Sequence, residues 1–260
     1  TTDFGDDKDR VILKEDGDLT YFASDTAYYI NKRERGFDIC IYMLGADHHG
    51  YIGRLKATAA CAGDDPEYNI HVLIGQLVKI MEGGEEVKLS KRAGTIITLE
   101  ELVEKVGVDA ARYTLIRYPV DTPMIMDIDV LKRNTNENPV YYVQYAHARI
   151  CSVQKKYVAL GKSLPNAFSD IENFHACDEL IQLALNFSFV VHNAGENLHP
   201  HLIVYYLRDL AQGFHHFYND VNILNAEEAE QINIMRSLAV VKNVLGSALE
   251  LLGIEPLDQM

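Results

Sequence analysis

The sequence predicts an α/β domain followed by an all-α domain, and two patterns support this. Short apolar runs alternate with helix-like segments over roughly the first eighty residues, an order typical of an open parallel sheet with crossover helices. Beyond residue 136, apolar residues recur at three- and four-residue spacings, which is the period of packed helices. We therefore expect a boundary there, with domains at 1–135 and 136–260.

Composition and charge narrow the class of protein. Of the 260 residues, 48% are apolar, and no apolar run is long enough for a membrane span. The polar, acidic start of the chain does not resemble a secretory signal. Four scattered cysteines without Cys-x-x-Cys spacing indicate neither a metal site nor a redox motif, so we expect a reducing, cytoplasmic location. The formal net charge of −14 disfavours broad phosphate contact but is compatible with a local basic patch.

The elements of the first domain follow from its apolar runs. The continuous run at 38–44 suits a strand buried on both faces of a parallel sheet. Ser24 is a candidate N-cap for the first helix, and Gly36 a stop signal. The expected strands are 20–23, 38–44 and 70–77, and the expected helices are 25–35 and 51–62.

After the last of these strands the pattern changes. Gly83-Gly84 between two apolar stretches predicts a hairpin. Thr98 and Glu101 have the spacing of a capping box, so a helix should begin near Leu99. Asp109 is a candidate cap for a further helix.

A connecting segment at 123–136 should lead into the helical domain. Pro139 follows Asn138, an arrangement typical of a helix start. The expected helices are 138–160, 178–195, 200–221 and 227–252.

Two lysines three residues apart flank a serine in a glycine-bordered loop, at Lys88, Ser90 and Lys91. Such a cationic arm can close over a polyphosphate, with the ammonium groups neutralising charge on departing pyrophosphate and the hydroxyl donating to a phosphate oxygen. Taken alone, the pattern is more often a solvated basic loop.

A polar turn, 45–50, follows the predicted strand at 38–44 and contains Asp47, His48 and His49. Ligands of open α/β sheets bind at the carboxyl ends of strands, so these side chains could face a nucleotide or an amino acid. Adjacent histidines point in different directions, which weakens a metal interpretation. A polar loop with a capping aspartate is an equally good interpretation.

Tyr21 and Asp25 lie one helical turn apart. A guanidinium ligand needs a carboxylate that accepts two parallel hydrogen bonds, together with a flat aromatic wall. The alternative is that Asp25 merely stabilises the start of a helix.

The first helix of the second domain carries Tyr141, Tyr142, Tyr145 and Arg149. Aromatic rings can stack on bases, and arginine can bind phosphate. For each aromatic residue singly, helical packing against a core explains it equally well.

These motifs together resemble one family. The segment at 88–92 resembles the Lys-Met-Ser-Lys-Ser loop of class I aminoacyl-tRNA synthetases, with Leu89 in place of Met and Arg92 in place of the last Ser. The Gly-Ala-Asp-His-His-Gly turn at 45–50 and the Thr-Tyr-x-x-x-Asp pattern at 20–25 are similar to segments of bacterial-type arginyl-tRNA synthetases. Segments 108–113 and 136–149, and the end of the chain at Met260, also resemble that family.

The resemblance covers nearly the whole chain and carries specific implications. It implies the C-terminal half of a Rossmann-like catalytic domain with stem-contact helices, followed by a helical-bundle anticodon-binding domain. The implied activity is ATP-dependent ligation of arginine to its tRNA through an arginyl-adenylate, with Mg²⁺ accompanying ATP and without DNA or membrane as partner. The implied roles are catalysis by Lys88, Ser90 and Lys91, ATP binding by these two lysines with Asp47, His48 and His49, arginine binding by Tyr21 and Asp25, and tRNA binding by Tyr141, Tyr145, Arg149 and Met260.

The His-Ile-Gly-His-type element of class I synthetases is not found in the sequence. We therefore expect the chain to begin midway through the catalytic fold and to be inactive alone. The alternative is a non-enzymatic tRNA-binding module derived from a synthetase. An unrelated nucleotidyl transferase would not explain Tyr21, Asp25 and the helical domain together. The oligomeric state and the bases read are not indicated.

Overall fold

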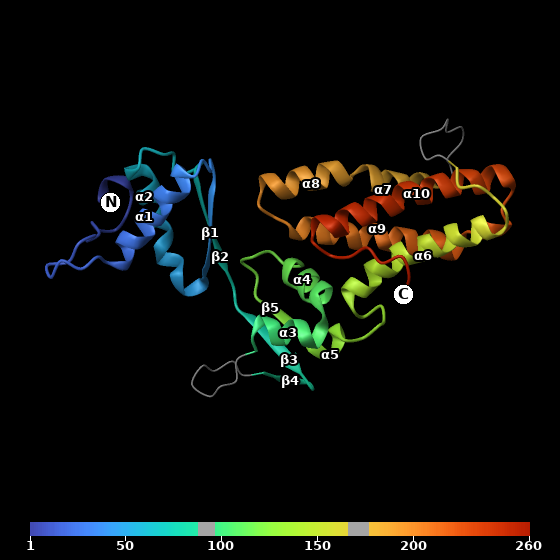
Figure 1. Ribbon diagram of the computed structural model, residues 1–260, viewed down its shortest axis with the longest axis horizontal. Helices are drawn as coiled ribbons and strands as arrows, with labels where there is room; N and C mark the ends of the chain where they lie inside the picture. The colour runs from blue at the N-terminus through green and yellow to red at the C-terminus, as the bar shows by residue number, and fades with distance from the viewer. Residues whose placement is uncertain (88–96, 166–176) are drawn as a thin grey trace. The chain divides into compact units, whose positions relative to one another are not determined.

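The computed structural model describes residues 1–87, 97–165 and 177–260 (Figure 1). The chain divides into two compact units, which are described separately. The first unit comprises Thr1–Val78 and Val120–Met124, and the second comprises Lys79–Pro119 and Ile125–Met260. This division reflects packing and leaves the predicted domain boundary at residue 136 untested. No described helix is both long and apolar enough to cross a membrane.

The first unit is a small α/β layer. Two parallel strands pair in register from Cys40↔Ile70 to Gly45↔Gly75. One face of the strand pair packs on the helices, around a core of Tyr29, Leu55 and Ala59. The elements in order are η1 (Thr2–Phe4), α1 (Tyr21–Glu34), β1 (Cys40–Gly45), η2 (Ala46–Tyr51), α2 (Ile52–Cys61) and β2 (Ile70–Gly75).

The strand predicted at 20–23 is wrong, because these residues start α1. Thr20 is in the extended conformation and its hydroxyl accepts a hydrogen bond from the Ala23 amide at 3.2 Å, so Thr20 rather than Ser24 is the N-cap. The apolar residues Phe22 and Ala23 are buried by the helix. A four-residue apolar run does not distinguish a strand from a first helical turn.

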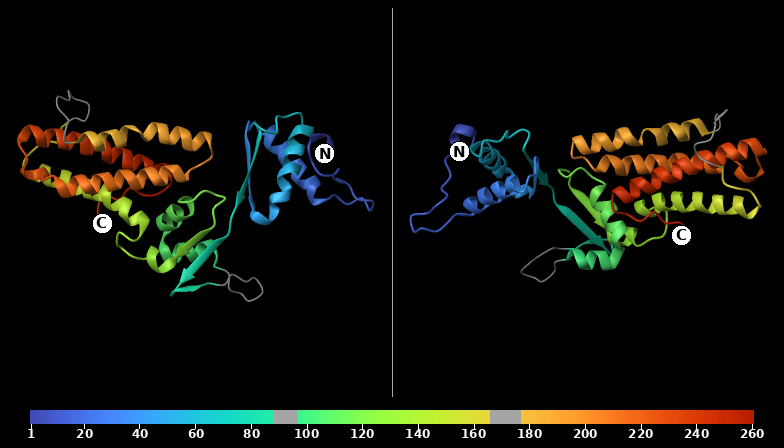
Figure 2. Two further views of the ribbon diagram at one scale, coloured as in Figure 1. Left: turned by 180° about the vertical axis from the view of Figure 1, so that it is seen from behind. Right: turned by 45° about the horizontal axis from the view of Figure 1, so that its top comes forward.

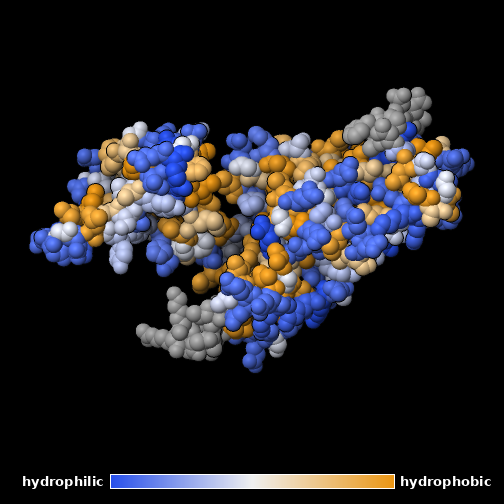
Figure 3. All heavy atoms as spheres, viewed as in Figure 1, coloured by the Kyte–Doolittle hydropathy of each residue, from blue (hydrophilic) through white to orange (hydrophobic). Residues whose placement is uncertain are grey.

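Alternate residues of the first strand leave apolar side chains in solvent. Ile39, Ile41 and Met43 are exposed, whereas Cys40 between them is buried. Figure 3 shows such apolar residues at the surface of this unit. The run predicted to be buried on both faces is therefore buried on one face only.

A buried phenol and an ion pair join α1 to the end of α2. Arg33 donates from Nε and Nη2 to the two oxygens of Asp64 at 2.8 and 2.9 Å, and the Tyr29 hydroxyl donates to the same carboxylate at 2.7 Å. These bonds, that from Arg33 first, hold the pKa of Asp64 below its usual value.

The second unit begins with a small sheet and short helices. The predicted glycine hairpin is confirmed, with antiparallel pairing of Met81↔Glu86 and Glu82↔Glu85. The predicted capping box of Thr98 and Glu101 is also confirmed. The sheet order is β4 (Glu85–Glu86), β3 (Val78–Glu82), β5 (Met124–Asp127), and the helices are α3 (Leu99–Val106), α4 (Val108–Ile116) and α5 (Ile128–Leu131).

A helical bundle completes this unit. The long helix α9 packs against α6, α7, α8 and α10, as the views in Figures 1 and 2 show. Leu207, Leu210 and Phe214 of α9 are fully buried there. The bundle comprises α6 (Pro139–Ala159), α7 (Asp178–Leu185), α8 (Phe187–Glu196), α9 (His201–Asp220), η4 (Ile223–Asn225) and α10 (Glu228–Leu251).

Three sequence expectations for this unit differ from the structure. The segment at 178–195 forms two helices that break at Asn186, and the expected connection at 123–136 contains β5 and α5. Asp109 lies inside the first turn of α4, which Gly107 precedes as N-cap. The Asp109 carboxylate instead accepts a hydrogen bond from Gln144 at 2.7 Å.

The chain after α10 forms a tail, residues 252–260, that returns along α6. The Arg112 guanidinium donates to the Leu252 carbonyl at 2.9 Å. Gly253 has a φ of 68°, and a Cβ there would lie 2.8 Å from the same guanidinium. The backbone conformation therefore favours glycine at this position, and any side chain there would displace the Arg112 guanidinium.

We predict that Asp64 contributes to the acid sensitivity of the first unit. A carboxyl whose pKa is lower in the folded state adds stability above its unfolded pKa of about 3.9, and that stability is lost as pH falls through the lower folded value. Asp64→Asn should be less stable at pH 7 and should lose less stability on acidification. Hydrogen exchange of α1 amides as a function of pH measures this. Glu15→Gln, at an exposed position, is the control, and an unchanged pH profile in Asp64→Asn would contradict the assignment.

Candidate functional site

The first unit places the predicted polar turn directly after a strand. Asp47, His48 and His49 form η2, which follows β1 at the carboxyl ends of the parallel pair. The Asp47 side chain is 82% exposed, and its carboxylate lies 3.6 Å from His48 Nε2. A Cβ on Gly45 would lie 2.8 Å from the Asp47 oxygen, so a larger residue there would shift the Asp47 side chain. The turn thus presents a carboxylate and imidazoles at the edge where ligands of such sheets bind.

Tyr21 and Asp25 occupy the first two turns of α1, where they share one face. Tyr21 is 90% exposed, and Asp25 is half-buried. A flat ring and a carboxylate on one face are the two groups that a guanidinium ligand requires.

Tyr42 of β1 belongs to the same neighbourhood, although the sequence did not indicate it. Its hydroxyl is buried without a hydrogen-bond partner in the described part of the chain, and the Lys32 ammonium lies 3.6 Å from its ring centroid. Burial foremost, and the nearby charge of Asp25, raise the pKa of Tyr42 to about 12. An unsatisfied buried hydroxyl is an available donor for a ligand.

The lysine segment lies outside the described residues. Lys88, Ser90 and Lys91 fall in the undescribed range 88–96, so their predicted placement over a polyphosphate stays a prediction.

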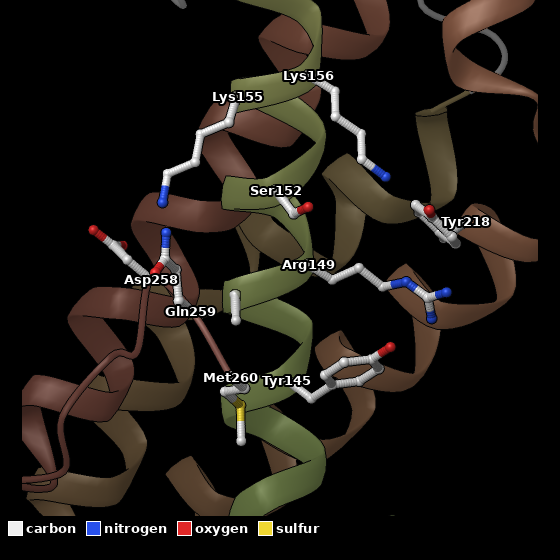
Figure 4. Close-up of a pocket in the computed structure, with 10 residues that line it drawn as sticks. Tyr145, Arg149, Ser152, Lys155, Lys156, Tyr218, Asp258, Gln259 and Met260 are labelled. Atoms are coloured by element: carbon white, nitrogen blue, oxygen red, sulfur yellow. The ribbon is translucent and has the colours of Figure 1, made fainter.

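In the second unit, a cleft of about 440 Å³ lies between α6, α9 and the tail (Figure 4). We call it the tyrosine cleft. It brings together Tyr145, Arg149 and Met260, three of the four residues predicted to bind tRNA. The fourth, Tyr141, stacks on Tyr145 with ring centroids 5.9 Å apart and an interplanar angle of 11°. The full lining is Tyr145, Ala148, Arg149, Ser152, Lys155, Lys156, Tyr218, Asp258, Gln259 and Met260.

Aromatic rings hold the arginine of this cleft in place. The Arg149 guanidinium lies 4.0 Å from the ring centroid of Tyr218 and 5.2 Å from that of Tyr145. In Figure 4 it points toward Tyr218, whereas Lys155 points toward the tail at Asp258 and Gln259. Two tyrosine faces and a planar cation offer stacking surfaces to a base.

The charge of the tyrosine cleft is positive in an acidic protein. Within residues 1–87, 97–165 and 177–260, no carboxylate forms an ion pair with Arg149, Lys155 or Lys156. Asp258 is the acidic residue of the lining, and a hydrogen bond from the Cys151 thiol keeps its pKa below the usual value. Lys155 and Lys156 were missed from the sequence, although Lys156 lies seven residues after Arg149 on the same helical face. Tyr218 comes from α9, so only the fold reveals it.

Buried side chains of α6 fix the tail in this cleft. Gln144 donates to the Glu255 carbonyl and His147 Nδ1 donates to the Leu257 carbonyl, both at 2.9 Å. The Cys151 thiol donates to Asp258 at 3.2 Å. Burial, followed by this bond, raises the pKa of Cys151 to about 11.

His147, Cys151 and Asp258 also lie within 4.8 Å of one another, and such a donor set suits a transition metal. In the structure, protons on His147 Nδ1 and Cys151 make the hydrogen bonds to the tail, so the three groups act as an anchor. The sequence-based expectation that no metal is bound stays a prediction.

Comparison with known proteins assigns the family. The family described as "tRNA synthetases class I (R), catalytic domain" matches residues 1–150, more than half of the chain. The chain belongs to the class I arginyl-tRNA synthetase family. The "DALR anticodon binding domain" matches residues 143–260, so a class I catalytic domain is followed by a helical anticodon-binding domain, as predicted.

Individual relatives of the family are similar to this chain over its whole length. Proteins named arginine–tRNA ligase from Kineococcus radiotolerans and Frankia alni are 46% and 48% identical over 100% of this chain. The chain spans 48% of the length of each of these curated relatives. A crystal structure described as an arginyl-tRNA synthetase from Campylobacter jejuni superimposes with a TM-score of 0.86 and 35% identity, covering 100% of this chain and 56% of that one.

We predict that the anchor keeps Cys151 unreactive. Cys61 is exposed, whereas Cys40, Cys151 and Cys177 are buried. A thiol whose pKa is raised by burial is a poor nucleophile because little thiolate forms. An aromatic disulfide reagent at pH 8 should label Cys61 rapidly, and the other three only after unfolding. Equal labelling rates for Cys61 and Cys151, measured by mass spectrometry, would show that the tail leaves α6 readily.

Proposed function

We propose that this chain is the part of an ATP-dependent arginine–tRNA ligase that carries the later half of the catalytic site and the tRNA-anticodon domain. The family match supports this proposal, and the tyrosine cleft carries it. Stacking faces with three cations that form no ion pair within the described residues, on a domain of the anticodon-binding family, suit a single-stranded RNA loop. The proposed division is 1–135 for catalysis and 136–260 for tRNA, in the cytoplasm.

The proposed chemistry has two steps. A carboxylate oxygen of arginine attacks the α-phosphorus of ATP, and the bond to the bridging oxygen breaks so that pyrophosphate leaves. A ribose hydroxyl of the tRNA then attacks the arginyl carbonyl carbon, and AMP leaves. No bond forms to the protein in either step, so positioning and charge stabilisation supply the catalysis.

In this proposal each described group has a role fitted to its surroundings. Asp25 accepts the guanidinium of arginine, and Tyr21 covers its flat face. Asp47, His48 and His49 border ATP at the strand ends. ATP carries Mg²⁺ on its phosphates, and the exposed Asp47 carboxylate is an oxygen donor of the kind this ion accepts.

The lysine segment is assigned to the stabilisation of the departing pyrophosphate. Lys88, Ser90 and Lys91 would neutralise charge as pyrophosphate departs, which is a contribution specific to the transition state. A non-enzymatic tRNA-binding module is the second candidate, because the tyrosine cleft by itself requires no catalysis.

We predict that the tyrosine cleft provides much of the affinity for tRNA. Replacing Tyr145 and Arg149 with alanine removes a stacking face worth about 1–3 kcal/mol and one phosphate or base contact. Binding of labelled tRNA(Arg) to this chain, followed by fluorescence anisotropy at several salt concentrations, should weaken at least tenfold at low salt.

The matched control is Arg35→Ala, which removes an exposed arginine of the first unit that lies outside the cleft. This control should bind tRNA like the parent. Equal affinities for the parent and the Tyr145/Arg149 variant would exclude these residues from the RNA site.

We predict different kinetic defects for the two halves of the proposed arginine-activation site. In a ligase of the relatives' full length, Lys91→Ala should lower the kcat of arginine-dependent pyrophosphate exchange into ATP, with little change in arginine KM. Asp25→Ala should instead raise arginine KM, since a lost charged partner costs on the order of 2–5 kcal/mol.

The 260-residue chain alone should show no exchange. Robust exchange from the full-length Lys91→Ala variant would remove the lysine segment from catalysis. A chain that binds tRNA but whose full-length form lacks exchange would favour the non-enzymatic module.

A further inference from the structure

A second cleft, of about 280 Å³, lies in the same unit at the N-terminal end of α6, and we call it the arginine cleft. Its walls come from α4, from the start of α6 and from α9. Arg117 lies at the C-terminal end of α4 and Arg208 on α9, and both line the cleft. Asn136, Tyr205 and Gln212 add neutral polar side chains. The sequence indicated neither Arg117 nor Arg208.

The two guanidinium groups act on the same region. Burial raises the pKa of Tyr113, which lines the cleft, and the charges of Arg117 and Arg208 both act in the opposite direction. The geometric observation is that both arginines line one cleft of about 280 Å³ together with Tyr113. Across the described ranges no carboxylate forms an ion pair with Arg117. The cleft thus has an uncompensated positive charge.

The nearby acidic groups do not cancel this charge. Glu137 lines the cleft but forms an ion pair with Arg133. Asp209 accepts from Arg208 through a single oxygen, at 3.1 and 3.3 Å, which leaves donors of that guanidinium for another partner. Two guanidinium forks with amide and phenol donors in the same cleft match the oxygens of a phosphodiester.

The arginine cleft and the tyrosine cleft follow one another along α6 and α9, and we call the two clefts together the groove. Tyr142 lines the first and Tyr145 the second, and the His215 ring contacts both, at 4.8 and 5.8 Å between centroids. Arg149 lies seven residues after Tyr142 on the same face, roughly 10 Å along the helix. On α9, Arg208 precedes Tyr218 in the same direction.

From this continuity we propose that the arginine cleft binds a backbone phosphate of the same tRNA whose bases occupy the tyrosine cleft. The proposal rests on the proposed function. It assigns Arg117 and Arg208 to the phosphate and His215 to the wall between base and phosphate sites. The phosphate contact fixes the register of the RNA along the groove and reads no base.

The test compares tRNA(Arg) binding by this chain and by an Arg117→Gln/Arg208→Gln variant over a range of KCl concentrations. Affinity should fall on the order of tenfold at low salt, and the slope of log K against log salt should become shallower by about 0.7–0.9 for one lost phosphate. The Arg117→Lys/Arg208→Lys variant keeps the charge without the fork, so it should regain the slope and only part of the affinity.

Two further variants serve as controls. The Tyr145/Arg149 variant distinguishes the arginine cleft from the tyrosine cleft, and an Asp209→Asn variant tests for a general effect of charge. Asp209→Asn removes the ion pair with Arg208, and it should bind tRNA as tightly as the parent or more tightly. If the Arg117→Gln/Arg208→Gln variant binds tRNA with the affinity and salt slope of the parent, the assignment of the arginine cleft to a phosphate is overturned. If the Tyr145/Arg149 variant binds tRNA like the parent, the assignment of the tyrosine cleft to RNA bases is overturned.

Calorimetry with ATP and with inorganic phosphate tests whether the cleft binds a free phosphate compound instead of a tRNA phosphate. We expect the parent and the Arg117→Gln/Arg208→Gln variant to bind each compound equally. Loss of ATP or phosphate binding with full retention of tRNA binding would assign the cleft to a free phosphate compound and overturn the proposal. Loss of tRNA binding without rescue by lysine, together with a lowered melting temperature, would identify a structural role and also overturn it.

Discussion

The hydrogen bonds between α6 and the tail are the interaction on which the proposed RNA-binding surface depends. Gln144, His147 and Cys151 are spaced by three and four residues, so they line one face of the helix. All three are buried, and all three donate to the tail. A buried donor left without an acceptor costs about 1–3 kcal/mol, so the tail is held where it meets the tyrosine cleft.

One helix therefore has two roles on two faces. The face with Gln144, His147 and Cys151 packs on the tail, and the face with Tyr142, Tyr145 and Arg149 forms the groove with α9. Because the protein has a net charge of −14, the cations of that groove are a local exception. Like-charge repulsion elsewhere on the surface disfavours misplaced RNA, and the groove gives the attraction a fixed position.

The sequence predicted most of the helices but failed where local signals compete. Thr20 and Tyr21–Ala23 read as a strand because the run is short and apolar, yet the Thr20 hydroxyl caps a helix there. The break at Asn186 carries no glycine or proline, so nothing in the sequence marked it. The capping box and the glycine hairpin were predictable because their signals are confined to a few adjacent residues.

The residues of the candidate sites also fall into those that the sequence predicted and those that it missed. Tyr141, Tyr145 and Arg149 could be chosen from one helix because their spacing places them near one another. Tyr218, Tyr42 and the Arg117–Arg208 pair depend on contacts between elements far apart in the sequence, which no local pattern encodes. The predicted roles of the polar turn at 45–50 depend on ligands, and geometry alone does not test them.

Gly253 shows how a position remote from RNA can determine RNA recognition. Its backbone turns the chain from α10 into the tail, directly against the Arg112 guanidinium. Any side chain there displaces that guanidinium from the Leu252 carbonyl and changes the direction in which the following residues leave. Under the proposed function, a genetic screen for loss of aminoacylation would therefore recover this glycine together with residues that contact RNA, because its substitution redirects the tail.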